Sequence, residues 1–243
     1  MKQVLYKIKE EIVNLFAYPT SRLEHYTVDY DEYWMDKRGD SLGKLSSWQK
    51  QRADIALRYM KDTPLASVVD VGCGDGSVLA YLKNKEAAGK IIGVDVSSTA
   101  LVKARLQGVE TILVDKNFTE GIDVIPDCDY VLLLEVLEHM PEAENFLTSM
   151  LEKSKHGVFF SFPNTGYIFH RLRLLFGRFP LQWRLHPSEH TRFWTYRDLL
   201  WWLKVLGYKN YKIHTYEGIP FLNKILPSVF AKGLFVYLPK DQS

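Results

Sequence analysis

Three glycines alternate with other residues directly after an apolar stretch, in the run Asp70-Val71-Gly72-Cys73-Gly74-Asp75-Gly76. Because glycine lacks a Cβ atom, a turn built from it bends sharply and lets a ligand approach the backbone closely. The next apolar stretch ends in Asp95, roughly 20 residues further on, where a carboxylate accepts hydrogen bonds from the hydroxyl groups of an adenosine ribose. The pattern therefore predicts a nucleoside-binding turn.

Two other glycine loops match this run less well. A dinucleotide-binding turn has the spacing G-x-G-x-x-G, and here Ser77 stands where the third glycine would be. A phosphate-binding P-loop requires Gly-Lys-Ser or Gly-Lys-Thr, which this run lacks. A tight turn with an incidental acid is the remaining alternative, and the position of Asp95 argues against it.

The pattern Asp-x-Gly-x-Gly-x-Gly resembles motif I of the class I S-adenosylmethionine-dependent methyltransferases, and the resemblance covers about residues 45–238. A sulfonium and an ammonium attract a carboxylate such as Asp70, whereas a pyrophosphate requires a positive helix end. The resemblance implies S-adenosylmethionine as cofactor and S-adenosylhomocysteine as product. It also implies a set of cofactor-binding residues: Asp70, Gly72, Cys73, Gly74, Gly76, Asp95, Val96, Asp115 and Glu135.

Within this set, the family implies that Asp95 holds the ribose, that Val96 packs on adenine and that Asp115 contacts the adenine amino group. Asp115 can equally be a solvated acid in a loop. Both alternatives stay open.

A second group of reactive residues follows the fourth apolar stretch, in Leu134-Glu135-Val136-Leu137-Glu138-His139-Met140. Ligands of open α/β sheets bind at the carboxyl ends of strands. We expect Glu135 to face the sulfonium, and we predict that His139 and Glu138 are catalytic, with His139 as the proton acceptor for a hydroxyl or amine.

The same loop resembles a Glu-x-x-Glu-His pattern that is widespread in the superfamily. Small-RNA 2′-O-methyltransferases use such a set with a distant histidine to hold Mg²⁺. The resemblance implies a candidate metal site in which the ion would acidify a substrate hydroxyl, made of Glu135, Glu138, His139 and His190. The alternative is that the two glutamates bind the cofactor and backbone amides, with His139 a base and His190 a loop residue.

The elements that must position these residues alternate between strands and helices. Short β-branched stretches alternate with helix-length segments between residues 67 and 162, which indicates a parallel sheet covered on both faces. Thr195 and Asp198 predict a capping box for a helix that Gly207 ends, and two further strands are expected near residues 209–216 and 233–238. The fold class is α/β. The resemblance implies a Rossmann-like sheet of seven strands, mostly parallel, with the last antiparallel.

The chain divides into a helical N-terminal extension at residues 1–60 and a methyltransferase-like domain at residues 61–243. An inserted cover is expected at about residues 163–192, because a connection of that length is usually functional or structured. In the related enzymes such an extension commonly caps the active site. Tyr26, Tyr30, Tyr33 and Trp34 are therefore candidate substrate contacts, and aromatic packing onto the sheet edge is the alternative.

The charges are balanced overall but not locally. Lys and Arg number 31 against 29 Asp and Glu, so the total charge gives no electrostatic reason to expect a nucleic-acid or membrane partner. Arginines concentrate in residues 166–192, and Arg171 and Arg173 are candidate contacts to an anionic substrate. The apolar residues between them also suit peripheral membrane contact and a lipid-linked substrate. A cover helix with solvated arginines is the alternative.

The remaining composition points to a cytoplasmic protein. Cys73 and Cys128 form no C-x-x-C pair, so we expect neither a disulfide framework nor a zinc finger. The first 16 residues are interrupted by charges and do not resemble a signal peptide, and we expect no membrane span.

These patterns together predict an S-adenosylmethionine-dependent methyltransferase acting on an O or N nucleophile of a small, anionic or lipid-linked molecule. The run Ser161-Phe162-Pro163-Asn164-Thr165-Gly166 resembles the MetW-like and ubiquinone-biosynthesis-like groups. The MetW-like group suggests an alternative, a non-catalytic partner of a methionine-biosynthesis acyltransferase. Further alternatives are a Mg²⁺-dependent RNA 2′-O-methyltransferase and a dehydrogenase. The residues specify neither the acceptor nor the oligomeric state.

Overall fold

The computed structural model describes residues 9–18, 28–35, 42–115, 121–182 and 189–242. One seven-stranded sheet runs through the molecule in the order β3-β2-β1-β4-β5-β7-β6. Its strands are β1 (Ala66–Val71), β2 (Ala88–Asp95), β3 (Glu110–Leu113), β4 (Cys128–Leu134), β5 (Ser154–Pro163), β6 (Lys212–Gly218) and β7 (Ala231–Pro239).

The pairing within this sheet confirms the predicted fold class. Strands β1 to β5 pair in parallel, and β7 lies antiparallel between β5 and β6. The strand order reverses between β1 and β4, because β2 and β3 follow β1 on one side and β4 starts the other half. A reversal of this kind leaves a crevice at the carboxyl ends of the two strands.

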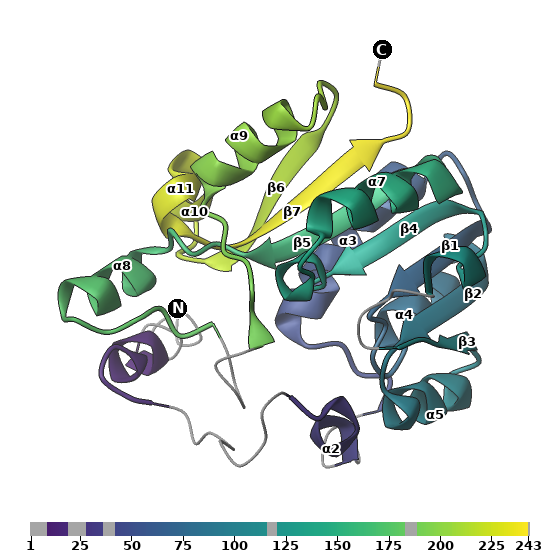
Figure 1. Ribbon diagram of the computed structural model, residues 1–243, viewed down its shortest axis with the longest axis horizontal. Coiled ribbons are helices and arrows are strands. Elements are labelled where there is room, and N and C mark those ends of the chain that lie inside the picture. Colours follow the sequence, from purple (N-terminus) through teal and green to yellow (C-terminus); the bar gives the residue numbers. More distant parts are fainter. Residues whose placement is uncertain (1–8, 19–27, 36–41, 116–120, 183–188, 243) are drawn as a thin grey trace.

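Helices cover both faces of the sheet, as Figure 1 shows. Neighbouring strand residues point to opposite faces, so Val68 joins one core cluster and Val69 joins the other. One face packs against α3 (Ser47–Met60), α4 (Ser77–Asn84) and α5 (Ser98–Leu106). The other face packs against α7 (Ala143–Lys153) and α9 (Tyr196–Val205).

Capping boxes begin two of these helices. Thr195 Oγ1 accepts from the Asp198 amide and Asp198 Oδ2 accepts from the Thr195 amide, as the spacing predicts. Ser46 and Gln49 make the same reciprocal bonds at the start of α3. Each box satisfies backbone N–H groups that the first helical turn leaves without partners.

Shorter elements surround the carboxyl ends of the strands. Residues 9–14 are helical, and α8 (Ile168–Leu175) lies in the segment where the sequence predicts a cover. The other short elements are α2 (Tyr30–Met35), α6 (Gly121–Val124), the 3₁₀ turn η1 (Leu137–His139), α10 (Leu222–Ile225) and α11 (Pro227–Phe230). Sequence periodicity did not predict α6, η1, α10 or α11, because three or four residues are too few to establish a helical period.

Among the described helices, none combines the length and the apolar character needed to cross a lipid bilayer.

Candidate active site

The glycine turn joins β1 to α4 at the switch point of the sheet. Gly72, Gly74 and Gly76 have φ angles of 72°, 55° and 74°, a region that side-chain-bearing residues rarely adopt. The Gly72 amide donates to the Val94 carbonyl over 2.7 Å, and the Gly74 amide donates to Asp95 Oδ2 over 2.8 Å. The turn is thus held against the end of β2.

The helix α2 lies directly over this turn. A Cβ atom added to Gly74 would lie 2.5 Å from the Trp34 indole. Asp31 attaches α2 to the start of α5, because its Oδ1 accepts from Ser97 Oγ over 2.7 Å and from the Thr99 amide over 2.9 Å. Helix α2 therefore covers the glycine turn.

Two buried acids lie beneath and beside the turn. Asp95 Oδ1 accepts from the Ser97 amide over 2.9 Å in addition to its bond from Gly74, and burial raises the pKa of Asp95. Asp70 lies at the end of β1, where burial raises its pKa to about 8. Its Oδ1 has no hydrogen-bond partner among the described residues. Asp70 is therefore placed to respond to a positive charge bound nearby.

One cavity of about 1890 Å³ connects the glycine turn to the loop after β4. The described residues that line it include five members of the predicted cofactor set: Gly72, Gly74, Asp95, Val96 and Glu135. It is also lined by predicted catalytic, metal and substrate residues: Tyr30, Tyr33, Trp34, Glu138, His139 and His190. Helices α2 and η1 and the segment before α9 thus meet at one cavity.

Other predicted cofactor residues lie outside the lining of this cavity. Asp70 and Cys73 are buried behind the glycine turn, and Gly76 packs against Val109 and Ala104. Asp115 is exposed after β3. The structure therefore separates residues that shape the turn from residues that face the cavity.

The predicted substrate arginines also lie outside the lining and bind backbone carbonyl groups. Arg171 donates to the carbonyls of Gly166 and Ser228, and Arg173 donates to the carbonyls of Phe179, Asn14 and Ala17. These contacts tie α8 to the helix of residues 9–14 and to α11. Tyr26 lies outside the described residues.

Glu135 belongs to a buried polar network rather than to the histidine cluster. Its φ of 62° is unusual for a residue other than glycine and turns the chain sharply after β4. Glu135 Oε1 lies 3.2 Å from Arg52 Nη1 and accepts from Tyr216 over 2.5 Å and from Ser161 over 3.0 Å. The Arg52 guanidinium lies 4.2 Å from the centroid of the Trp48 ring. Helix α3 and strand β6 therefore fix this carboxylate.

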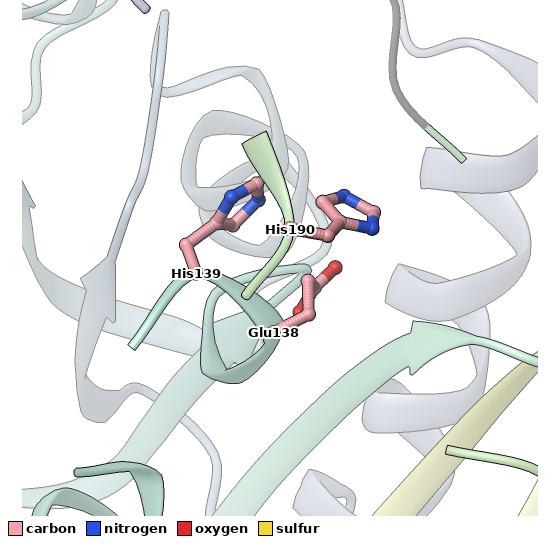
Figure 2. Close-up of side chains that lie close together, drawn as sticks. All are labelled: Glu138, His139 and His190. Carbon is pink, nitrogen blue, oxygen red and sulfur yellow. The ribbon is translucent and has the colours of Figure 1, made fainter. Parts of the chain in front are cut away.

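The side chains of Glu138, His139 and His190 come together, as Figure 2 shows. One candidate ligand atom from each lies within 4.8 Å of the other two. The two imidazole rings meet edge to face with centroids 4.8 Å apart. Their segments are joined because the amides of Thr191 and Arg192 both donate to the Glu138 carbonyl, over 2.9 and 3.1 Å. Glu135, the fourth predicted ligand, is not part of this group.

Burial shifts the pKa values of this cluster. Burial raises the pKa of Glu138, with the charge of Glu135 adding to the effect, and both Glu138 carboxylate oxygens lack partners within the described part of the chain. Burial also lowers the pKa of His139 and lowers that of His190 to about 3. His139 Nδ1 lies against the Glu189 carbonyl, so a neutral ring carries its proton there and leaves Nε2 as an acceptor.

Comparison with known proteins places this site in a family. A family model described as a methyltransferase domain matches residues 31–213. The chain belongs to this methyltransferase family. The match includes all of α2 except its first residue, the glycine turn, the loop after β4 and the segment that carries His190.

Individual relatives of this methyltransferase domain differ in function. The bifunctional methionine biosynthesis protein MetXA/MetW of Rhodopirellula baltica is 29% identical over 63% of this chain and 28% of its own length. A ubiquinone biosynthesis O-methyltransferase of Aliivibrio fischeri is 36% identical over 55% of this chain and 58% of its own. The solved structure of small RNA methyltransferase HEN1 matches with a TM-score of 0.57 and 26% identity over 80% of this chain and 25% of that chain. The chain thus spans less than two thirds of the length of each.

The site also contains residues that sequence reasoning missed. Arg52, Tyr216 and Asp31 come from α3, β6 and α2, and each acts on a residue more than 60 positions away. Arg52 and Tyr216 carry no motif and read as ordinary helix and strand residues. Asp31 stands among aromatic residues and belongs to no motif. No local signal identifies such contacts.

Proposed function

We propose that this chain is an S-adenosylmethionine-dependent methyltransferase that moves a methyl group to a hydroxyl or amine of a small molecule. The observation that carries the proposal is that the glycine turn, Asp95 and His139 line one cavity. A nucleoside cofactor bound at the turn and an acceptor beside His139 would then share one enclosed space. Such proximity and orientation supply much of the acceleration in a transfer reaction.

The residues around the turn fit this cofactor. Gly72 and Gly74 line the cavity beside Trp34, so a ligand there can contact the backbone of the turn where no Cβ atom projects. Asp95 retains acceptor capacity for the ribose hydroxyls, since each carboxylate oxygen has two lone pairs. Val96 and Ile122 provide apolar lining for adenine. Asp70, whose Oδ1 is unpartnered among the described residues, would gain a cation nearby.

His139 Nε2 is the proposed proton acceptor. The nucleophile of the acceptor molecule bonds to the methyl carbon, and the electron pair of the broken carbon–sulfur bond stays on sulfur. His139 Nε2 takes the proton that the nucleophile loses, while Nδ1–H continues to donate to the Glu189 carbonyl. The neutral ring favoured by burial is the form that this role requires.

The cavity wall favours a neutral or cationic acceptor over an anionic one. The described lining residues include eight acids and one lysine, Lys232. Lys232 is already paired with Glu11 over 2.5 Å. With Arg171 and Arg173 bound to carbonyl groups outside the lining, we do not retain the anionic acceptor. The cavity exceeds the 300–1,000 Å³ that is typical of ligand sites, so it has room for both molecules.

Calorimetry and isotope transfer test the proposal. S-adenosylhomocysteine should bind and NAD⁺ should not. Label from methyl-labelled S-adenosylmethionine should then pass to a small molecule in fractionated cell extract, and His139→Ala should abolish transfer while leaving binding intact. Binding without transfer to any fraction would favour the binding-only partner, whereas NAD⁺ binding would contradict the cofactor assignment.

A divalent metal is the second candidate, supported by the convergence of Glu138, His139 and His190. The unpartnered carboxylate oxygens of Glu138 and the two neutral imidazoles fit a borderline metal such as Co²⁺ or Zn²⁺. They do not fit Mg²⁺, which prefers an oxygen shell, because Glu135 is bound to Arg52. A bound ion would acidify an acceptor hydroxyl.

The metal and base roles compete for the same atom, since His139 Nδ1 is occupied and Nε2 can either bind an ion or take a proton. His190→Ala distinguishes them. If His139 is the base, this variant should retain transfer and show no metal requirement. If a metal acts, Co²⁺ titration of the unaltered protein should show a site that His190→Ala removes.

A further inference from the structure

Exposed apolar side chains gather at one end of the molecule. At the end of α8, Leu175 is 76% exposed, and Leu174 and Phe176 beside it are also exposed. In and before α10, Phe221 is 83% exposed and Ile225 is 76% exposed. We call these residues, together with Phe16, the α8–α10 face. Contiguous exposed apolar residues commonly mark a surface that contacts another molecule.

Contacts link the elements that carry the α8–α10 face. The Phe16 and Phe176 rings are 5.5 Å apart, which joins the segment after the first helix to α8. Arg171 Nη2 donates to the Ser228 carbonyl over 3.0 Å, which joins α8 to α11, and α11 follows α10 directly. Figure 1 shows α8, α10, α11 and the helix of residues 9–14 together on the left side.

The same elements line the far end of the cavity. Asn14 comes from the helix of residues 9–14, His170 comes from α8 and Asn223 comes from α10. The cavity therefore extends from the glycine turn to the elements that carry the α8–α10 face. A molecule that reaches the cavity past this face would meet apolar side chains first.

The charges around the face suit a lipid headgroup region. Lys224 in α10 is exposed, and the exposed Arg171 in α8 keeps its charge at the surface while its guanidinium donates to the Gly166 and Ser228 carbonyl groups. The Arg178 guanidinium lies 5.1 Å from the centroid of the Tyr18 ring. Short helices that combine exposed Leu, Ile and Phe with Arg and Lys lie in the interface of anionic membranes. The long cationic side chains reach the headgroups while their stems remain in apolar surroundings.

We propose that the α8–α10 face docks on the surface of an anionic lipid bilayer, and that the acceptor is an amphiphile which enters the cavity from that surface. The choice of acceptor rests on the proposed function, but the docking does not. The polar group of the amphiphile would reach the glycine turn and His139, and its apolar part would remain near α8 and α10.

Sedimentation with vesicles tests the docking. The full chain should bind vesicles of phosphatidylcholine with phosphatidylglycerol, and binding should weaken on vesicles of phosphatidylcholine alone and at high salt. Leu175→Glu and Ile225→Glu should each lower the partition constant about tenfold. Leu106→Glu is the matched control, since Leu106 is 73% exposed on α5, on the opposite side in Figure 1. This control should bind like the unaltered chain.

Four results overturn the docking proposal. The first is that the chain does not bind vesicles, and the second is that Leu175→Glu and Ile225→Glu leave the partition constant unchanged. The third is that Leu106→Glu lowers the partition constant as much as these two variants do. The fourth is that ultracentrifugation shows a dimer which Leu175→Glu dissociates. Failure of the proposed function is distinguishable, because it appears as missing S-adenosylhomocysteine binding in calorimetry without vesicles. If the chain binds vesicles but does not bind S-adenosylhomocysteine, the docking proposal stands and the proposed methyl transfer is rejected.

Discussion

Arg52 Nη1 in α3 lies 3.2 Å from Glu135 Oε1 at the carboxyl end of β4. Arg52 is 3% exposed, and Tyr216 of β6 donates to the same carboxylate oxygen. The pair connects the helix before β1 to the turn that carries Glu138 and His139. It also keeps Glu135 away from the cluster that His190 joins.

Replacing Arg52 should destabilise the fold. Arg52→Met removes the cation and leaves the mostly buried Glu135 carboxylate without its cationic partner. The free energy of unfolding should therefore fall by about 3 kcal/mol. Glu135→Gln in the same chain removes that unpaired charge, and the double variant should therefore lose less than the sum of the single losses. Urea unfolding of the unaltered chain, the two single variants and the double variant measures these free energies. If the losses in the single variants simply add in the double variant, the pairing is contradicted.

Gly74→Ala should lower the free energy of unfolding more than the same substitution at a glycine whose Cβ position is open. An alanine there adopts a φ of 55° and also meets the Trp34 indole. Gly108→Ala is the matched control, because Gly108 has a φ of 75° and open space around its Cβ position. The free energy of unfolding should fall by about 1 kcal/mol in the control and by about 2 kcal/mol or more in Gly74→Ala. Equal losses in thermal or urea unfolding would mean that α2 does not press on the turn.

Asp95→Asn should weaken binding of S-adenosylhomocysteine about 10- to 100-fold, since hydrogen bonds to a charged acceptor contribute roughly 1.5–3 kcal/mol. Asp115→Asn should change the affinity less than about twofold, because Asp115 is exposed and is not among the described residues that line the cavity. Calorimetry on both variants measures the difference. A loss in Asp115→Asn as large as that in Asp95→Asn would restore the adenine contact expected from the sequence.

Asp70 should make stability depend on pH. Burial raises its folded-state pKa to about 8, whereas an Asp in an unfolded chain titrates near ~4. Between these values the folded chain holds the proton more tightly than the unfolded chain does. The contribution of Asp70 to stability therefore falls as the pH rises from about 4 to about 8, and is constant above that.

The same group links cofactor binding to proton release. A cation bound near Asp70 favours its charged form, so the affinity for S-adenosylmethionine should rise with pH by up to about tenfold per unit and level off near pH 8. Asp70→Asn should flatten this profile. Calorimetry in two buffers of different ionisation enthalpy measures the released proton. Identical heats in both buffers would show that Asp70 does not take part.

Local patterns in the sequence predicted much of the fold. The apolar stretches of β1 to β5, the glycine turn and the Thr195–Asp198 capping box depend on residues close together in the chain, so periodicity and spacing identify them. The approach of Glu138, His139 and His190 was expected from a family resemblance. The structure brings these three together and places Glu135 elsewhere.

The sequence by itself determined the alternation of strands and helices from β1 to β5, the turn at Gly72 to Gly76 and the acid at the end of β2. Tertiary structure alone decided that Arg52 neutralises Glu135, that Trp34 covers Gly74 and that Arg171 and Arg173 bind carbonyl groups. The reason is physical. Backbone conformation follows from neighbouring residues, whereas the partner of a buried charge depends on which distant elements the packed core brings to it.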